Sequence, residues 1–259
     1  APVSLFRSSL NGHRLSEMDP EEFLTDPDRK QVYVTFMFDL IAPGYHLFTR
    51  LFSFGMDKKW KRLLVRELLE RSSATAVVAD LACGTGDIAS ALAALLPRAV
   101  VVGLDVSAEM IGVAARLRNA TGRPYYAMCD VTRLSLRDAS LDAVTIGYGL
   151  RNLPDLDVGL QEISRVLKAG GCLLILDFFR PKNRWWNRVF LGYLRRAGAI
   201  AGWLWHREPD AFVYIARSVE RFVTLEQVAV HLSRCGFETP FILRRLGGGI
   251  GVLVAQKSL

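Results

Sequence analysis

The sequence lacks the features that are typical of secreted, metal-binding and membrane-spanning proteins. Its four cysteines form no Cys-x-x-Cys pair and its four histidines are scattered, so we expect neither a disulfide framework nor a protein-built metal site. No apolar run is long enough to cross a bilayer, and residues 1–20 hold no continuous apolar stretch of a secretory signal. We therefore expect a cytoplasmic protein, and peripheral contact with a membrane is left open.

The composition is that of a chain with a large core and a moderate excess of positive charge. Of the 259 residues, 51% are hydrophobic, and 33 basic against 26 acidic residues give a net charge of +7. This length suits one large α/β domain or two small ones. The basic excess permits an anionic partner without requiring one.

The pattern of the chain changes at about residue 72. Residues 1–30 are polar and contain several turn formers, which predicts a loose arm, and residues 31–72 are aromatic-rich and helical with a break at Ala42–Tyr45. Residues 1–72 are therefore interpreted as an arm and a helical cap. Residues 73–259 form the core, because short apolar runs there alternate with helical patterns, which predicts a Rossmann-like α/β fold with a mostly parallel sheet.

The predicted strands and helices of the core follow from this alternation. Strands are expected over residues 75–82, 99–105, 124–130, 141–147 and 171–179, and a closing hairpin-like pair over residues 237–246 and 250–257. Helices are expected over residues 87–97, 107–120 and 157–171, the second with Ser107 as its N-cap.

A glycine-rich loop joins the first predicted strand to the first predicted helix. It reads Asp80-Leu-Ala-Cys-Gly84-Thr-Gly86-Asp87, and with Ala89 it satisfies GxGxxA, a pattern that also occurs at dinucleotide sites. Two carboxylates beside a diphosphate would be repulsive, whereas they suit a ligand with an ammonium group and no phosphate. The loop therefore favours S-adenosylmethionine (SAM) and disfavours an NAD oxidoreductase.

Acidic residues also end the next two predicted strands. Asp105 is placed to accept both hydroxyls of a ribose and Asp130 to meet an adenine amine, because ligands of such sheets lie beyond the carboxyl ends of the strands. Each aspartate alone is typical of an ordinary helix cap. Three of them at successive strand ends beside a glycine loop indicate a binding site.

The run TIGYGLRNLPD, from Thr145 to Asp155, puts polar residues where a buried strand should end. Its two glycines keep the backbone small, and Pro154 turns the chain away into the next helix. A plain strand-to-helix connection requires neither Arg151 nor Asn152, so these two residues are candidates for the reacting site.

These segments resemble the class I SAM-dependent methyltransferases, and more narrowly the quinone C-methyltransferase family of ubiquinone and menaquinone biosynthesis (UbiE/COQ5/MenG). The matching segments are FDLIAPGYHLFTRLFSFGMDKKWKR, VADLACGTGDIA, GLDVSAEMI, LDAVTIGYGLRNLPDLDVGLQEISRVLKAGGCLLILDF and FVYIARSV, and the likeness extends from about Val34 to the end of the chain. Many methyltransferases share the glycine loop, whereas GLRN with VLKAGG is much more specific to this family. The resemblance implies a seven-stranded sheet whose last strand is antiparallel, with a helical insertion over residues 181–220.

The resemblance also implies a site and a reaction. Methylation of a ring carbon of a prenylated quinol is expected, and the proposed reacting residues correspond here to Arg151, Asn152 and Tyr45. Residues around the substrate are expected to be His46, Tyr148, Phe212 and Tyr214. SAM is expected to contact Asp80, Gly84, Thr85, Gly86, Asp105, Val106, Asp130, Val131 and Gly147.

The chemistry of the side chains constrains their roles. A guanidinium stays protonated at ordinary pH, so we expect Arg151 to stabilise a phenolate or to orient a water molecule that takes the proton. Asn152 would hold that oxygen, and Tyr45 would close the pocket. His46 is a candidate base because a histidine titrates near neutral pH, and a packing role is the alternative.

The chain departs from the family where the substrate should lie. The family usually has an acidic residue after the tyrosine and an Asn-Asp pair further on, whereas this chain has His46 and then Thr49-Arg50, and its later tyrosine motif reads Phe212-Val-Tyr214. The ring therefore stays open between a benzoquinol, a naphthoquinol and a small aromatic secondary metabolite.

The insertion carries a basic and aromatic segment. On a helix over residues 184–206, Trp186, Phe190, Tyr193, Ala197 and Ile200 share one face, and Arg184, Arg188 and Arg195 lie opposite. This arrangement is typical of a membrane interface and of a lid over an apolar substrate. It is equally typical of an amphipathic helix packed on the core or on a second subunit, so a homodimer is left open.

Two further function classes are weighed against methylation of a quinol. A nucleic-acid methyltransferase would fit the basic charge, but the Asn/Asp-Pro-Pro-aromatic run and an RNA-binding module are both missing, so we expect no nucleic-acid partner. A SAM-fold protein with another reaction, or a scaffold of a quinone-biosynthesis complex, would not need the retained Arg151-Asn152 pair.

Overall fold

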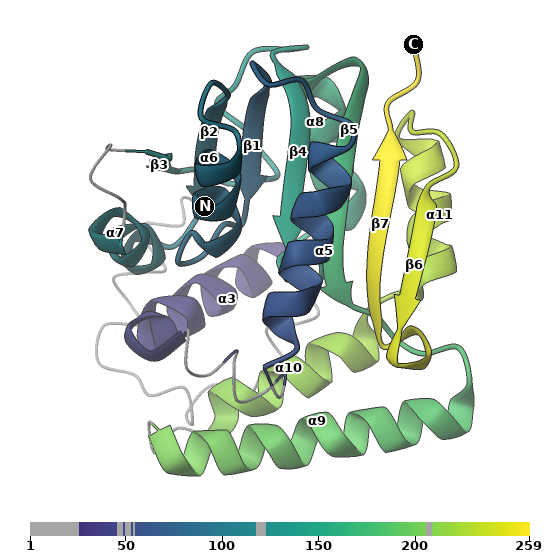
Figure 1. The fold of residues 1–259 in the computed structure, drawn as a ribbon. Coiled ribbons are helices and arrows are strands. Elements are labelled where there is room, and N and C mark those ends of the chain that lie inside the picture. The colour runs from purple at the N-terminus through teal and green to yellow at the C-terminus, as the bar shows by residue number, and fades with distance from the viewer. Residues whose placement is uncertain (1–25, 46–48, 50–52, 54, 118–122, 206–208) are drawn as a thin grey trace.

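The computed structural model describes residues 26–45, 49, 53, 55–117, 123–205 and 209–259, without the side chains of residues 199–213. A seven-stranded sheet in the order β3-β2-β1-β4-β5-β7-β6 forms its centre (Figure 1). The strands are β1 (Val77–Leu81), β2 (Val100–Asp105), β3 (Tyr125–Met128), β4 (Leu141–Gly147), β5 (Leu167–Phe178), β6 (Phe241–Arg245) and β7 (Ile250–Gln256).

The pairing of the strands confirms the predicted topology. β1 to β5 are parallel, and β7, the last strand, runs antiparallel to both β5 and β6. The helices are α3 (Pro27–Ile41), α5 (Asp57–Leu69), α6 (Asp87–Leu95), α7 (Ala108–Leu117), α8 (Leu156–Val166), α9 (Arg184–Trp205), α10 (Pro209–Arg221) and α11 (Leu225–Arg234). Three-residue 3-10 turns cover Ala42–Gly44 (η2), Leu150–Asn152 (η3) and Leu246–Gly248 (η4).

Two hydrophobic layers enclose the sheet because successive strand residues point to opposite faces. In β5, Leu174 and Leu176 join the layer that also contains residues of α3, α5, α6, α9 and α10. Leu173 and Ile175 join the opposite layer, against α8 and α11. The helices α3, α9 and α10 lie beyond the carboxyl ends of the parallel strands, where ligands of such sheets bind (Figure 1).

Two predicted boundaries are wrong. The arm expected over residues 1–30 ends earlier, because Asp26 caps α3 by accepting from the Arg29 amide (3.0 Å) and Pro27 fits the first helical position. The helix expected over residues 157–171 ends at Val166, and the chain continues extended into β5. Gly170 has a left-handed φ of 72°, which the preceding helix cannot continue through.

The predicted N-cap of α7 is confirmed. The Ser107 hydroxyl accepts a hydrogen bond from the Met110 amide (3.1 Å) and donates one to Asp39 of α3 (2.5 Å). The cap helix α3 is thereby attached to the core at the start of α7.

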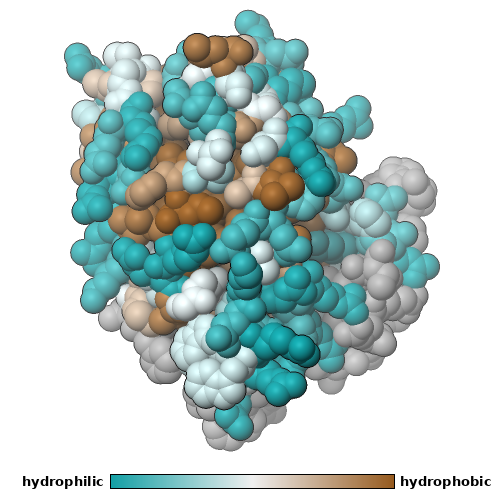
Figure 2. All heavy atoms as spheres, turned by 90° about the vertical axis from the view of Figure 1, so that its right-hand side faces the viewer, coloured by the Kyte–Doolittle hydropathy of each residue, from teal (hydrophilic) through white to brown (hydrophobic). Residues whose placement is uncertain are grey.

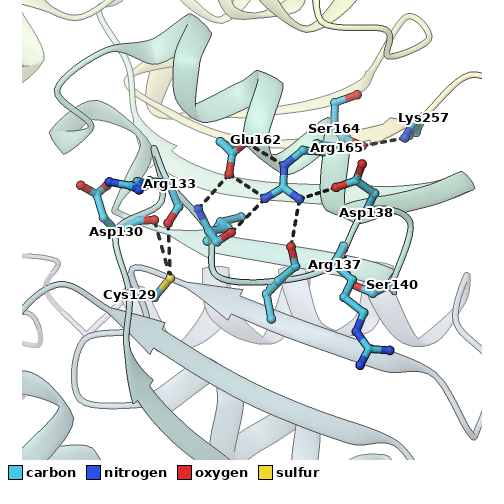
Figure 3. A network of polar contacts seen from close by, with 12 residues as sticks. Cys129, Asp130, Arg133, Arg137, Asp138, Ser140, Glu162, Ser164, Arg165 and Lys257 are labelled. Carbon is cyan, nitrogen blue, oxygen red and sulfur yellow. Dashed lines mark hydrogen bonds and ion pairs between the residues drawn. The ribbon is translucent and has the colours of Figure 1, made fainter.

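Arg165 of α8 fixes the connection that follows β3 (Figure 3). Its guanidinium donates to both carboxylate oxygens of Glu162 (2.8 Å each), to Asp138 (2.5 Å) and to the carbonyls of Leu134 and Leu136 (2.9 Å each). The contacts of Arg165 therefore fix the part of this connection that leads into β4.

The helix α9 packs along α10, and its predicted faces are confirmed as far as Ala197, whereas the side chain of Ile200 lies outside the described residues. The inner face is buried or half-buried at Trp186, Phe190, Tyr193 and Ala197. The outer face is exposed at Arg184, Arg188 and Arg195. Trp186 also donates from its indole nitrogen to the Leu246 carbonyl (2.7 Å), which ties α9 to the β6–β7 edge of the sheet.

The side of the molecule that carries β6 shows a band of hydrophobic residues between hydrophilic margins (Figure 2). Phe241 at the start of this edge strand is 51% exposed, and Arg244 and Arg245 at its end are exposed as well. Charged residues on an edge strand disfavour pairing with another chain. In the described part of the chain, no helix has both the length and the apolar composition needed to cross a membrane.

Two glycines provide a test of the packing. A Cβ on Gly149 would lie 2.4 Å from the Cβ of Ala82, so Gly149→Ala should lower the free energy of unfolding by about 1–3 kcal/mol. Gly192 lies within α9 with open space around it, so Gly192→Ala should raise that energy by up to about 1 kcal/mol. Urea unfolding of the two variants measures both effects, and a Gly149→Ala variant as stable as the wild type would contradict this packing.

Candidate active site

A tight turn joins β4 to α8 at the carboxyl end of the sheet. Tyr148 has a left-handed backbone (φ 62°), and its amide donates to the Leu176 carbonyl at the end of β5 (2.6 Å). Asp155 then caps α8 by accepting from the Val158 amide (3.0 Å). Backbone strain of this kind gathers at functional sites, and here it presents the side chains of η3 from a short, fastened segment.

A buried ion pair holds this turn. The Arg151 guanidinium donates from Nη1 to Asp177 Oδ1 (2.6 Å) and to the Tyr148 carbonyl (2.7 Å), and the Arg151 amide donates to Asp177 Oδ2 (3.1 Å). Both side chains are almost completely buried. Burial disfavours the charge of Arg151, but attraction to Asp177, the hydrogen bond to it and the nearby Tyr214 and Tyr45 together outweigh burial and raise the pKa of Arg151, so the guanidinium remains charged.

The neighbouring Asn152 is held by two hydrogen bonds of its side chain. Its amide nitrogen donates to the Tyr148 carbonyl (3.1 Å), and the Tyr214 hydroxyl of α10 donates to its Oδ1 (3.1 Å). Tyr214 is fully buried, and its ring lies 5.5 Å from the ring of Tyr33 in α3. Tyr214 therefore orients Asn152 from the far side.

A lysine of the cap helix also binds the turn. Lys30 Nζ donates to the carbonyls of Leu153 (2.5 Å) and Arg151 (3.2 Å). Burial, and then the charge of Arg151, lower the pKa of Lys30 to about 8. Two segments far apart in the sequence, α3 and η3, are thereby fixed to each other.

An apolar cavity, the reaction cavity, lies between α3, α10 and this turn. Two buried polar atoms of its walls have no hydrogen-bond partner in the described part of the chain, the Tyr148 hydroxyl and Arg151 Nε. A buried polar group without a partner is costly, so both atoms are available to a polar ligand. The lining residues are Met37, Phe38, Ile41, Tyr45, Thr49, Ser53, Asp57, Tyr148, Arg151, Phe178 and Ile215.

A second cavity, the strand-end pocket, adjoins the first. Phe38, Tyr45 and Tyr148 line both spaces, so these three side chains form the boundary between them. Asn152 faces the strand-end pocket, whereas Arg151 faces the reaction cavity. The expected residues Gly84, Asp105, Val106, Asp130, Val131 and Gly147 all line the strand-end pocket.

The acidic residues of this region also bind the backbone. Asp105 accepts from the amides of Gly84 (2.8 Å) and Ser107 (2.9 Å), and Asp80 accepts from the Ala89 amide (3.1 Å) and the Thr145 hydroxyl (2.7 Å). Because Gly86, the N-cap of α6, has no side chain, Asp80 supplies the capping carboxylate from β1. Burial raises the pKa of both aspartates, to about 7 for Asp80.

The negative charge beside the glycine loop is smaller than the sequence suggests, because one of its carboxylates is paired within the protein. Asp87 in the first turn of α6 pairs with Lys61 of α5, whose Nζ lies 2.6 Å from Asp87 Oδ2. Part of the negative charge beside the loop is therefore neutralised within the protein. The remaining preference for a cationic ligand comes from Asp80, Asp105 and Asp130.

The structure separates the expected residues into groups. Thr85 and Asp80 line a recess that adjoins the strand-end pocket at Gly84 and Gly147. Gly86 is not among the lining residues. A Cβ at this position would lie 2.2 Å from the hydroxyl of Tyr126, so the packing of the protein itself requires this glycine. His46 and the side chain of Phe212 lie outside the described residues.

Three charged residues beside the site, Asp177, Lys30 and Lys61, were not predicted from the sequence. Asp177 ends the fifth strand in the same way as Asp80 and Asp105 end theirs, and that position was a usable signal. Lys30 and Lys61 carried no local signal, because their partners lie in other elements.

Comparison with known proteins agrees with this geometry. Residues 26–256 match the model of the ubiE/COQ5 methyltransferase family. The chain is 32% identical to a demethylmenaquinone methyltransferase of Desulfitobacterium hafniense (92% of this chain, 96% of that protein) and 38% identical to a ubiquinone/menaquinone biosynthesis C-methyltransferase UbiE of Syntrophotalea carbinolica (84% and 90%). The solved structure of a SAM-dependent methyltransferase of Thermotoga maritima matches the fold with a TM-score of 0.59 at 16% identity, over 86% of this chain and 99% of that one.

The fold and the site together define a class I SAM-dependent methyltransferase. Within that class, the chain belongs to the ubiE/COQ5 methyltransferase family. The residues present suit SAM, because carboxylates at the ends of β2 and β3 and the apolar side chains of Met110, Val131 and Leu153 line one pocket beside the glycine loop. SAM, when bound, supplies a methyl group on a cationic sulfonium.

A matched pair of lysines tests the role of the cap helix. Lys257 donates to the carbonyls of Ser164 (2.7 Å) and Leu167 (2.9 Å) and lines neither cavity, so it resembles Lys30 except in location. Lys30→Met and Lys257→Met should each destabilise the protein by about 1–3 kcal/mol. Only Lys30→Met should also lower kcat for methyl transfer, on the order of 10-fold, because only that change releases Arg151 and Asn152. Equal kcat values in thermally matched assays would refute this role.

Proposed function

We propose that this enzyme methylates a ring carbon of a lipophilic quinol, either a polyprenyl benzoquinol or demethylmenaquinol. The observation that carries the proposal is the reaction cavity, which has apolar walls and two buried polar atoms without partners, beside the pocket that suits SAM. An aromatic ring with a hydroxyl group would fill the apolar space and satisfy both atoms. The names of the two bacterial relatives support the same substrate class.

The side chains of the reaction cavity suit an electron-rich ring. Phe178 lies under the Arg151 guanidinium at 5.5 Å, and Met37, Ile41 and Ile215 complete a wall without charge. Such surroundings exclude water and strengthen electrostatic interactions with a phenolate.

Arg151 and Tyr148 are suited to bind the oxygen of the quinol. The raised pKa of Arg151 excludes it as a base, and its charge stabilises the phenolate that activates the ring. Burial also raises the pKa of Tyr148 and of Tyr45, so both hydroxyls stay protonated and act as donors. Tyr45 lies at the boundary of the two cavities, where the ring carbon and the methyl group would meet.

Transfer of a labelled methyl group from SAM to demethylmenaquinol and to a prenyl benzoquinol tests the proposal. Arg151→Ala should lower kcat by about 10²–10³-fold, because it removes the cation that faces the phenolate. Tyr148→Phe should lower it less, and both variants should keep the wild-type Kd for SAM.

Removal of Arg151 also leaves Asp177 buried without its cation, which can cost about 3–5 kcal/mol of stability. The double variant Arg151→Ala/Asp177→Asn therefore serves as the folded control. If Arg151→Lys and the double variant both keep the wild-type kcat, the assigned role of Arg151 is wrong. If neither quinol accepts the label, the substrate class is wrong and a small aromatic metabolite becomes the next candidate.

We also propose that the outer face of α9 lies against an anionic membrane, from which a prenylated quinol would arrive. Its support is the exposed set Arg184, Trp185 (69% exposed) and Arg188. Arg195 is less suited to this role, because it pairs with Glu220 of α10 (2.6 Å).

Flotation with vesicles that contain a quarter anionic lipid tests this face. Arg184→Glu/Arg188→Glu should reduce vesicle binding several-fold, whereas Arg133→Glu, a control on the opposite layer, should not. Equal binding by wild type and double variant would remove the membrane proposal. A changed oligomeric state in the double variant would instead assign the face to a second subunit.

A further inference from the structure

Asp57 is a buried carboxylate in the wall of the reaction cavity. It begins α5 and is 5% exposed. Its Oδ1 accepts from the Ser53 hydroxyl (3.1 Å), and its Oδ2 lies 3.7 Å from Lys61 Nζ. No other acidic residue lines this cavity in the described part of the chain.

Among the described residues that line the cavity, the other ionisable side chains cannot take a proton at neutral pH. Burial raises the pKa of Tyr45 and of Tyr148, which are therefore already protonated, and Arg151 remains a cation. The ring must nevertheless lose a hydroxyl proton before it attacks the methyl group. We infer that Asp57 is the general base that removes this proton, an inference that rests on the proposed function.

Asp57 also borders a second space, which is open to the surface. It lines the open groove between α5 and α6 together with Lys61 and Asp87. Lys61 Nζ lies between the two carboxylates, 3.7 Å from Asp57 and 2.6 Å from Asp87, and the side chain of Asp87 is 36% exposed. Asp57 therefore borders both the reaction cavity and an open groove at the surface, so a proton that it takes up can pass to solvent in the groove.

The proton and electron count of the step is balanced. The hydroxyl proton moves to the Asp57 carboxylate, the phenolate electron pair forms the new bond from ring carbon to methyl, and the sulfur–methyl bond breaks with its electrons on sulfur. The methylated ring carbon then loses its hydrogen as a proton that returns to the ring oxygen, and the proton taken by Asp57 is the one that leaves overall.

Asp57→Asn tests the inference, with Asp142→Asn as matched control. Asp142 likewise lies beside a lysine, Lys168 (2.7 Å), and accepts from the Val77 amide (2.7 Å), at a site that lines neither cavity. Asp57→Asn should lower kcat by about 10²–10⁴-fold with the Kd for SAM unchanged, whereas Asp142→Asn should leave kcat unchanged.

A second substrate separates a base from a structural residue. A quinol with an electron-withdrawing ring substituent ionises more easily, so the deficit of Asp57→Asn should shrink for this quinol and should also shrink as the pH rises. A deficit that is the same for both quinols, or no deficit, would overturn the inference while the proposed function stands.

If Asp57→Asn fails to fold, Asp57→Ala assayed with added formate is the alternative. Recovery of kcat with formate, absent from the wild type, supports the base, and no recovery in a folded variant refutes it. If the wild type transfers no methyl group to either quinol, the proposed function fails and the role of Asp57 fails with it.

Discussion

The buried pair between Arg151 and Asp177 is the constraint on which the site depends. A buried charged pair is stable only when hydrogen bonds compensate its lost hydration, and loss of one partner typically costs about 3–5 kcal/mol. Asp177 meets this requirement by accepting from the guanidinium and from the amides of Arg151 and Phe178. The same contacts draw η3 onto the end of β5 and leave one face of the guanidinium toward the reaction cavity.

Two adjacent residues of the turn that this pair holds line two different spaces. Arg151 faces the reaction cavity and Asn152 the strand-end pocket, and Tyr148 between the two spaces contacts both. Under the proposed function, the methyl acceptor and the methyl donor would lie in these two adjoining spaces, beside one short turn. Lys30 and Tyr214 reach this turn from α3 and α10, so the helical parts outside the sheet decide its geometry.

The carboxylates of the site each have a structural contact and a ligand-facing role. Asp80 caps α6 and Asp105 binds the glycine loop, so neither can be replaced without moving the backbone that it holds. Their burial raises their pKa values, and a cationic ligand would favour their charged forms. Stability of the loop and affinity for a cation are therefore coupled through the same oxygen atoms.

The sequence by itself determined the features that depend on neighbouring residues. Alternating apolar strands and helices, the glycine loop and the cap at Ser107 are local, and GLRN pointed to the reacting turn. The sequence did not reveal where α8 ends and β5 begins, because the pairing of Leu167 with Leu141 in the sheet overrides the helical pattern. Nor did it reveal the partners of the site, since Asp177 lies 26 positions from Arg151 and Lys30 lies 121. Only the tertiary structure brought Asp57 to the cavity of Arg151, because burial and proximity depend on how distant elements pack.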